Sequence, residues 1–307
     1  MPLLPSQYFS NWYVVTLDGK PRILSSFQEQ LNQQTSLEKY IQGDIGNHVV
    51  SIPAKHYSSS VTCPILLIRP ETEADRMYDV FDLILEYVEK IQNPITNNSN
   101  SASGVNKFNY VIESSSINIS AEGAEVTANL ESWTKFTSET AGIGYTNKIS
   151  YKPEEYNFYA RKARFYDIQF GIFGENFLIE SATLSFAFAN SKTHYLPGFN
   201  SGFGSTVPLY SIGGYQVTGN VTLVVKPEQY ETLKLYNAQS PGIFNAVKHS
   251  LYLRILDRTE NATNDKILNL GDFMFMPSVD ISITTNNIIK STINFVTMFR
   301  RTSSITN

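Results

Sequence analysis

Residues 13–26 read YVVTLDGKPRILSS, and residues 168–181 read IQFGIFGENFLIES. Each stretch holds an alternating apolar segment, then a glycine (Gly19 or Gly174), then a second segment with two adjacent aliphatic residues. Alternation that is interrupted by a glycine turn is typical of a β-hairpin. Because the same pattern returns in the second half of the chain, the sequence predicts that one structural unit occurs twice.

Two more pairs of segments repeat in the same order. ILLIRPE at residues 65–71 matches TLVVKPE at residues 222–228, and both are apolar runs that end in a base, a proline and a glutamate. Proline lacks a backbone N–H, so it ends a strand and suits the first turn of a helix. SINIS at residues 116–120 matches VDIS at residues 279–282, and each begins a second predicted hairpin.

The repeats predict two tandem units, residues 1–150 and residues 151–307. Each would hold a hairpin, a long polar connection, a strand, a helix and a closing hairpin. The first helix is indicated by apolar residues at helical spacing from Met77 to Ile91, and a shorter one by Tyr230, Leu233 and Tyr236. The predicted fold class is mainly β with one helix per unit, as two tandem antiparallel β-sandwich or barrel domains. Chance similarity between two β-rich halves is the alternative.

Composition supports the β class and excludes several functions. Aromatic residues make up 13% of the 307 residues, and such side chains suit half-buried pleated surfaces. Lys and Arg number 24 against 28 Asp and Glu, which argues against tight binding of nucleic acid backbones. With Cys63 as its single cysteine, the chain forms no internal disulfide and no zinc site of several thiolates. Residues 1–10 lack a signal-peptide pattern and no long apolar run occurs, so we expect synthesis in a cytoplasm and no membrane insertion.

No catalytic, cofactor or metal site is predicted. Phosphate-loop, zinc-helix and nucleophile-elbow motifs are absent from the sequence. Cys63 lies in an apolar run and is interpreted as a buried structural cysteine. The four acidic residues of the first helix are interpreted as a solvated face, and the four histidines as ordinary core or surface residues. These acidic residues and histidines are Asp79, Asp82, Glu86 and Glu89, and His48, His56, His194 and His249.

Basic residues gather at two places. Arg161, Lys162 and Arg164 stand among aromatic residues, a mixture that proteins use on single-stranded nucleic acids. In an acidic chain we expect this cluster to be a subunit contact or an ordinary strand edge instead. Arg300 and Arg301 are expected in a solvated tail.

Four stretches resemble the core of bacteriophage tail tube proteins. In that family a segment rich in Ser, Thr and Gly leads into a strand, a polar breaker and an amphipathic helix, and a hairpin closes the domain. The matching stretches are HYSSSVTCPILLIRPETEADRMYDVFDLIL at 56–85, YQVTGNVTLVVKPEQYETL at 215–233, SINISAEGAEVTANLES at 116–132 and VDISITTNNIIKSTINFV at 279–296.

The resemblance implies a structural virion protein of a phage tail, either a tail tube or a baseplate hub protein. Domains of this family form six-domain rings, in which long hairpins join into a β-barrel around a channel that conducts DNA. A duplicated chain would then form a homotrimer with pseudo-sixfold symmetry, or second a hexamer. Adjacent tube, baseplate or spike proteins are the implied partners, with DNA only as passing cargo and with neither enzymatic activity nor a cofactor. By analogy, residues 27–59 and 183–214 are candidate channel-lining segments, with ordinary surface loops as the alternative.

Two other functions remain open from the sequence. A β-sandwich binding module or receptor-binding adhesin would use exposed aromatic residues, such as Trp12 or Trp133, to stack on sugars. An enzyme would need a concave pocket with convergent polar groups, for which the sequence has no motif.

Overall fold

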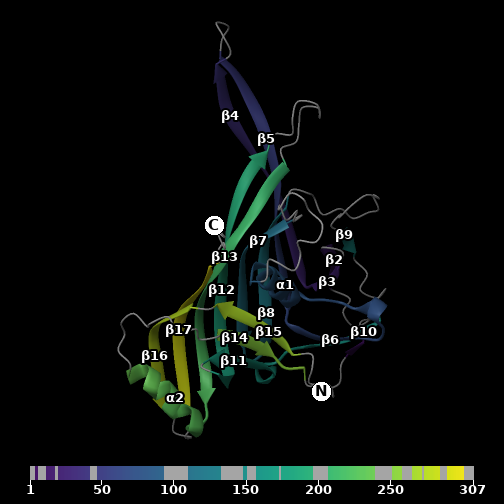
Figure 1. Ribbon diagram of the computed structural model, residues 1–307. Helices are drawn as coiled ribbons and strands as arrows, with labels where there is room; N and C mark the ends of the chain where they lie inside the picture. The colour runs from purple at the N-terminus through teal and green to yellow at the C-terminus, as the bar shows by residue number, and fades with distance from the viewer. Residues whose placement is uncertain are drawn as a thin grey trace, which may run out of the picture.

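The computed structural model describes residues 4–5, 12–17, 20–41, 47–92, 110–132, 148–150, 157–172, 174–195, 207–238, 251–257, 265–271, 273–283 and 289–300. This part of the chain is mainly β, as predicted, with long antiparallel strands and two α-helices (Figure 1). The elements of the first half are β1 (Leu4–Pro5), β2 (Tyr13–Leu17), β3 (Lys20–Leu24), β4 (Ser26–Ile41), β5 (Asn47–Pro64), β6 (Leu66–Pro70), a 3-10 turn η2 (Glu73–Asp75), α1 (Val80–Gln92), β7 (Tyr110–Ser120), β8 (Gly123–Ser132) and β9 (Lys148–Ser150). Those of the second half are β10 (Phe158–Lys162), a 3-10 turn η5 (Phe165–Asp167), β11 (Ile168–Ile172), β12 (Glu175–Tyr195), β13 (Val207–Val225), α2 (Pro227–Ala238), β14 (Leu251–Ile255), β15 (Lys266–Gly271), β16 (Phe273–Ile283) and β17 (Ile289–Arg300).

One large antiparallel sheet runs through both halves. Its strands follow the order β4-β5-β8-β7-β12-β13-β17-β16, and β11, β14 and β15 branch off beside the first residues of β12. Two smaller sheets, β1-β10-β6 and β3-β2-β9, lie beside it. Apart from Val111, the buried apolar side chains of the described residues belong to one core cluster. The large sheet is therefore continuous from one half of the chain to the other.

Apart from β11, β14 and β15, the large sheet contains two sets of four strands with the same order. The first set is β4-β5-β8-β7, and the second set is β12-β13-β17-β16. The β2–β3 hairpin, which precedes the first set, matches the hairpin that β11 forms with the first residues of β12, because Val14 pairs with Ile23 as Gln169 pairs with Leu178. The predicted repeat of the N-terminal hairpin is thus present in the structure. The proposed domain boundary at residue 150 stays a prediction.

Register and side-chain contacts relate the two sets residue by residue. Thr62 lies opposite Thr127 in the first set, and Thr222 lies opposite Thr292 in the second. The hydroxyl oxygens of each threonine pair are within hydrogen-bond distance, at 3.1 Å and 3.2 Å respectively. The same local contact therefore occurs at the same place in both sets.

This register corrects two of the sequence alignments. Thr222 corresponds to Thr62 and not to Ile65, because residues 66–70 form the separate strand β6, which pairs with β10 outside the large sheet. Ile117 corresponds to Ile281 and not to Val279, since Ile117 follows the partner of Thr127 and Ile281 follows the partner of Thr292. Short apolar runs resemble one another in sequence, so only strand pairing decides which ones are equivalent.

The two predicted helices are present and differ in burial. In α1 the apolar residues at helical spacing, including Phe81, Ile84 and Val88, face the core and are fully buried. α2 begins at Pro227 and buries Leu233, while Tyr230 is half-buried against the core. The stronger apolar stripe of α1 thus corresponds to the more deeply packed helix.

The long polar connections expected at residues 27–59 and 183–214 are mostly strands. β4 pairs with β5 along sixteen residues and β12 pairs with β13 as far as Tyr195 and Val207, so both form long hairpins that extend from the sheet (Figure 1). The surface-loop interpretation of these segments is therefore wrong along the paired residues. The sequence pattern did not predict these strands, because a hairpin that extends beyond the core needs no apolar face and so lacks apolar alternation.

Candidate assembly site

The two four-strand sets meet where β7 pairs with β12, and we call this contact the inner junction. Six residue pairs join the strands, from Ile119 opposite Ala182 to Ser114 opposite Ala187. On the core side Ile117 and Leu184 face each other and are fully buried, and Ile119 is 3% exposed. Strand pairing and apolar burial therefore act together at this junction.

Polar side chains reinforce the inner junction above the core. The Asn190 amide of β12 donates a hydrogen bond to the Ile112 carbonyl of β7 at 2.8 Å, and the Tyr87 hydroxyl of α1 donates to Asn190 Oδ1 at 3.3 Å. Burial raises the pKa of the Tyr87 hydroxyl, so this group stays a donor. Gln92 at the end of α1 donates to the Tyr215 hydroxyl of β13 at 2.6 Å. The helix of the first half thus bonds to two strands of the second.

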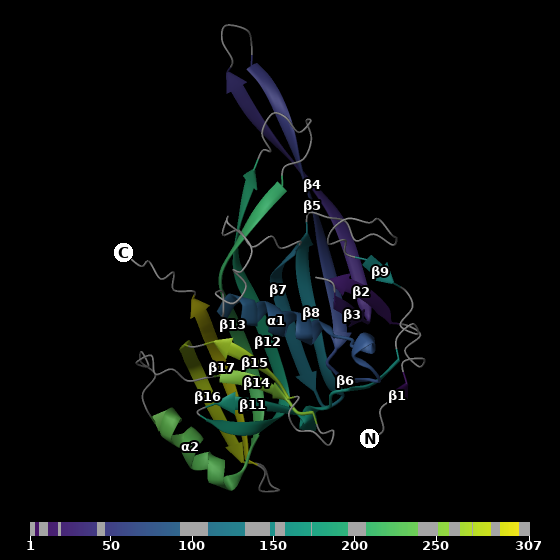
Figure 2. The same cartoon turned by 45° about the vertical axis from the view of Figure 1, so that its right-hand side comes forward.

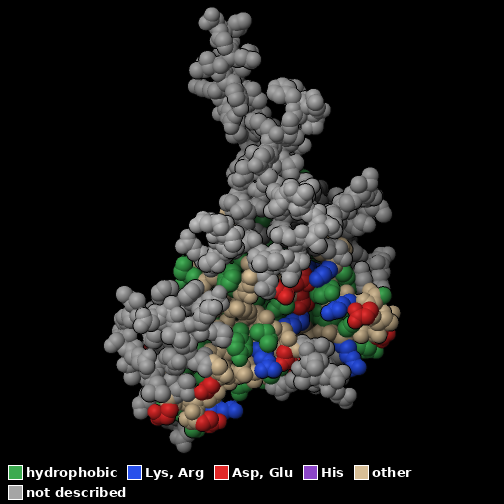
Figure 3. Space-filling model, in the orientation of Figure 1, with side chains coloured by type: hydrophobic (Ala, Val, Ile, Leu, Met, Phe, Trp, Pro, Cys, Tyr) green, Lys and Arg blue, Asp and Glu red, His purple; other side chains and the backbone are tan. Residues whose placement is uncertain are grey.

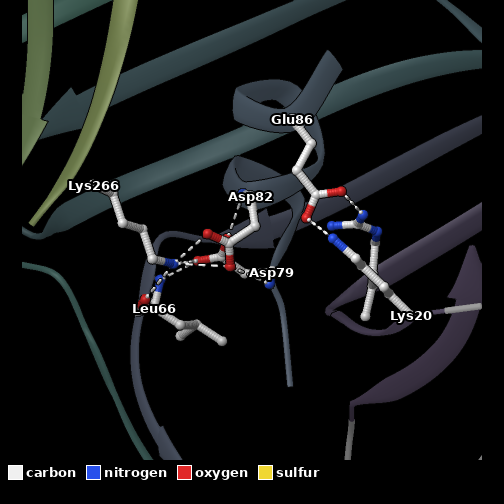
Figure 4. A network of polar contacts seen from close by, with 7 residues as sticks. Lys20, Leu66, Asp79, Asp82, Glu86 and Lys266 are labelled. Atoms are coloured by element: carbon white, nitrogen blue, oxygen red, sulfur yellow. Dashed lines mark hydrogen bonds and ion pairs between the residues drawn. The ribbon is translucent and has the colours of Figure 1, made fainter. Parts of the chain in front are cut away.

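A buried ionic cluster also connects the halves (Figure 4). The Lys266 ammonium of β15 lies 2.8 Å from Asp82 Oδ1 and 3.6 Å from Asp79 Oδ2, at the start of α1. Asp79 Oδ2 also accepts a hydrogen bond from the Leu66 amide at 2.7 Å. A cation placed between two buried carboxylates compensates charges that would be costly to bury alone.

The pKa values of the two carboxyl groups move in opposite directions. Burial, and next the charge of Asp82, raise the pKa of Asp79 to about 6. The attraction and hydrogen bond of Lys266 outweigh the burial of Asp82 and lower the pKa of that carboxyl. The two carboxylates in turn raise the pKa of Lys266, which keeps the amine protonated. One lysine thus stabilises the nearer carboxylate more strongly than the farther one.

This cluster corrects the interpretation of the acidic helix face as solvated. Asp79 and Asp82 are buried. Asp79 Oδ1 accepts a hydrogen bond from the Asp82 amide at 2.8 Å, and Asp82 Oδ2 accepts one from the Asp79 amide at 3.1 Å. These reciprocal bonds form a capping box at the helix start. Only Glu89 is exposed as predicted. The sequence signal for this capping box was the pair Asp79 and Asp82, two acidic residues three positions apart at the start of an apolar helix.

Glu86 likewise has partners in the chain. Its carboxylate accepts from Lys20 Nζ at 2.9 Å and from Arg22 Nη2 at 2.8 Å, and Arg22 is fully buried (Figure 4). The Lys20 and Arg22 cations also lie over the Tyr78 ring. The β2–β3 hairpin is therefore attached to α1 by charge as well as by apolar packing.

In the described part of the chain three outer strands of the large sheet have an unpaired edge: β15, which pairs only with β14, and the two end strands of the eight-strand order, β4 and β16. Within the described ranges β4 pairs only with β5 and β16 only with β17, and these two strands lie toward opposite sides of the sheet (Figure 2). Ile283 of β16 is 64% exposed, although its equivalent in β7, Ile119, is buried. An unpaired edge with an exposed isoleucine offers both hydrogen bonds and apolar area to another strand.

Uncharged polar residues form most of the face of the sheet opposite the core, together with charged residues such as Glu125, Asp280 and Lys290. One row of hydroxyl side chains crosses six neighbouring strands at successive register partners, all exposed or half-buried. This row is Ser26, Thr62, Thr127, Ser116, Ser185 and Thr218. On the side of the molecule in Figure 3, the described basic and acidic side chains are interspersed without a large area of one sign. The sheet therefore presents water with a wide hydroxyl-lined face.

The remaining residues singled out from the sequence have structural roles where they are described. Cys63 is fully buried as predicted, and burial raises the pKa of its thiol. Arg161 forms a bidentate ion pair with Asp167, and Arg164 donates to the Glu122 carbonyl. Arg161 and Lys162 belong to β10, which pairs with β6 along its length and with β1 only at Tyr159 and Ala160, and Arg164 follows that strand. The expected subunit contact or strand edge at this cluster stays a prediction.

Other sequence candidates are only partly described. Arg300 is the last residue of β17 and lies opposite Gly214, so it does not begin a tail, while Arg301 lies outside the described residues. The backbones of His48, His56 and His194 belong to β5 and β12, and His249 is not described. Trp12 packs half-buried against the core, and Trp133 is not described.

Comparisons with known proteins assign no family. No protein-family model matches the chain, and no curated protein matches it either. No described helix combines the length and the apolarity needed to cross a membrane. Among the described residues, three or more potential metal-ligating side chains do not gather at any point.

Proposed function

We propose that this chain is a structural protein of a bacteriophage tail, a tail tube or baseplate hub protein, whose copies form a ring around a channel that conducts DNA. The observation that carries the proposal is the pair of like four-strand sets, which join edge to edge and leave an unpaired edge at each end. A sheet of this kind has no free edge once copies close into a barrel. The ring is therefore a homo-oligomer that continues the contact already made inside the chain.

The open face of the sheet supports a channel lining. Hydroxyl and amide side chains dominate it, and its lysine, Lys290, is paired with Glu180, so the face has little unpaired positive charge to hold DNA phosphates. DNA would accordingly pass as cargo and not be retained. The excess of acidic over basic residues in the whole chain agrees with this role.

Two sets per chain favour a homotrimer with pseudo-sixfold symmetry, and a hexamer is the second arrangement. In the trimer, three copies supply six four-strand sets. A trimer would connect a sixfold tube to a threefold spike, so adjacent tube, baseplate or spike proteins are the expected neighbours in the virion. Trp12, which a sugar-binding adhesin would expose, packs half-buried against the core, whereas Tyr159, Phe165 and Tyr166 are exposed.

Negative-stain electron microscopy, together with the mass from light scattering, tests this function. We expect rings with six lobes around a central hole and a mass near three times 34.6 kDa. Rings with six times the chain mass would support the tail role and indicate a hexamer instead of a trimer. Compact particles without a hole, at concentrations where the mass shows assembly, would contradict the proposal.

A further inference from the structure

The strand order of the two sets indicates how the outer strands β4 and β16 would pair with each other. The two four-strand sets correspond position by position, so β7 corresponds to β16 and β12 corresponds to β4. The inner junction between β7 and β12 is therefore a template for a contact between β16 and β4. One chain cannot make that contact with itself, since the two strands lie toward opposite sides of its sheet (Figure 2).

We infer that β16 of one copy pairs antiparallel with β4 of a second copy, with Ser282 opposite Gln28 and Ile283 opposite Phe27. The register follows from the template, in which Asn118 lies opposite Thr183 and Ile119 opposite Ala182. We call this contact the outer junction. It deepens the proposed ring and rests on it, because it identifies a second copy of this chain as the partner of the free edges of β4 and β16.

Burial of the isoleucines is the independent support for a partner at this edge. Ile119 and Ile283 occupy equivalent register positions, opposite Ala124 and Ile289 of their hairpin partners. Their exposures are 3% and 64%, and the strand that covers Ile119 is β12. Phe27 on β4 is half-buried against the core and is the residue that would cover Ile283.

One position on the core side of the outer junction carries a charge that its template lacks. β4 has Glu29, half-buried, where β12 has the fully buried Leu184. An inward-pointing charge on an edge strand opposes indiscriminate pairing with other strands. The outer junction therefore favours a specific partner at the expense of affinity, and Glu29→Leu should tighten the association.

Both junctions have the same direction along the sheet, so the contact is head to tail. A contact between two different surfaces of one chain produces a closed ring or an open filament, and not an isolated twofold dimer. Each copy would use β4 on one side and β16 on the other.

Cysteine cross-linking tests the register. The variant with Gln28→Cys and Ser282→Cys should form disulfides between chains on mild oxidation, because directly opposite residues are close enough to be bridged. Asn118→Cys with Thr183→Cys is the positive control, which cross-links within one chain at the inner junction. Gln28→Cys with Ser278→Cys displaces the pair by four residues and should not cross-link.

Apolar contact is tested separately by the concentration dependence of assembly. Ile283→Ala should weaken self-association by about tenfold to a hundredfold, since a buried isoleucine side chain loses most of its apolar area. Ile267→Ala is the matched control, because Ile267 is a similarly exposed isoleucine, 53%, on the edge strand β15. Equal effects of the two substitutions would overturn the outer junction.

The outcomes separate this junction from the proposed ring. Rings without the Gln28–Ser282 cross-link, or with a stronger cross-link in the displaced pair, would overturn the register and leave the ring in place. Cross-linked open filaments would support the junction and contradict the ring. A chain that stays monomeric at every concentration reached would overturn both.

Discussion

The inner junction and the free edge of β16 have the same sequence features and opposite environments. Ile117 and Ile119 are buried beneath β12, whereas Ile281 is partly buried and Ile283 is mostly exposed. The difference arises from the presence of a neighbouring strand and not from the residue type. In the proposed outer junction, a second copy would cover the exposed Ile283 as β12 covers Ile119.

The inner junction also has contacts that the outer edge lacks in a single chain. Helix α1 reaches Asn190 and Tyr215 across it, and Lys266 joins Asp79 and Asp82. These contacts hold the two halves in one arrangement. A ring built from such chains would alternate a reinforced junction within each chain with a plainer junction between chains.

The largest expected difference is between the two equivalent isoleucines. Ile119→Ala should lower the free energy of unfolding of the isolated chain by about 2–5 kcal/mol, because it leaves a cavity in the core. Ile283→Ala should change it by less than about 0.5 kcal/mol, because its side chain is mostly exposed. Urea denaturation at low protein concentration measures both, and equal losses would contradict the difference in burial between these two equivalent positions.

Removal of the lysine cation should break the link between the halves almost as severely. Lys266→Met leaves two buried carboxylates without their cation and should cost about 3 kcal/mol in denaturant unfolding. The matched control is Lys290→Met, since Lys290 pairs with Glu180 across half-exposed positions and should contribute at most about 1 kcal/mol. A loss for Lys266→Met no larger than that of the control would contradict the role of the cluster.

The pH dependence of stability should report on the same cluster. The pKa of Asp79 is about 6 in the folded chain, above its ordinary value of 3.8, so the folded chain binds more protons between these values. The free energy of unfolding should therefore gain ~2 kcal/mol from this group as the pH falls from about 7 to about 4. Asp79→Asn should remove that gain. Denaturant titrations at a series of pH values give the slopes, and identical slopes would show that Asp79 stays ionised.

The smallest expected effect concerns the hydrogen bond from α1 to β12. Tyr87→Phe removes the hydroxyl that bonds to Asn190 and keeps the ring that packs edge-on against Phe188, so it should cost about 1 kcal/mol. Hydrogen exchange should accelerate at the amides of the inner junction. Tyr252→Phe is the control, because its hydroxyl bonds to Asn176 away from that junction. Faster exchange at the junction in both variants would mean that the effect is global.

Local pattern was sufficient for several elements of the fold. The glycine-separated runs at residues 13–26 and 168–181 predicted two matching hairpins, and apolar spacing predicted α1 and α2. The burial of Cys63 also followed from its apolar neighbours. These features depend on residues close together in the chain, and so periodicity suffices to find them.

The candidate site required contacts that no local pattern contains. Lys266 pairs with Asp79 and Asp82, which are more than half of the chain away in sequence. The sequence pattern placed these two carboxylates on a solvated helix face, whereas the structure buries them. The long hairpins were hidden by their polar residues, and the true register between the sets differed from the sequence alignment. Strand pairing between distant residues decided each of these outcomes.

The sequence by itself determined a mainly β chain with repeated hairpins, two helices and no evident catalytic motif, because composition and short-range periodicity specify such elements. Tertiary structure alone decided that the two strand sets join edge to edge, that Ile119 is covered and that Ile283 is not. Which edge of a sheet stays unpaired depends on the order of the strands in space. Strand order is a property of long-range hydrogen bonding, which the order of residues along the chain does not express.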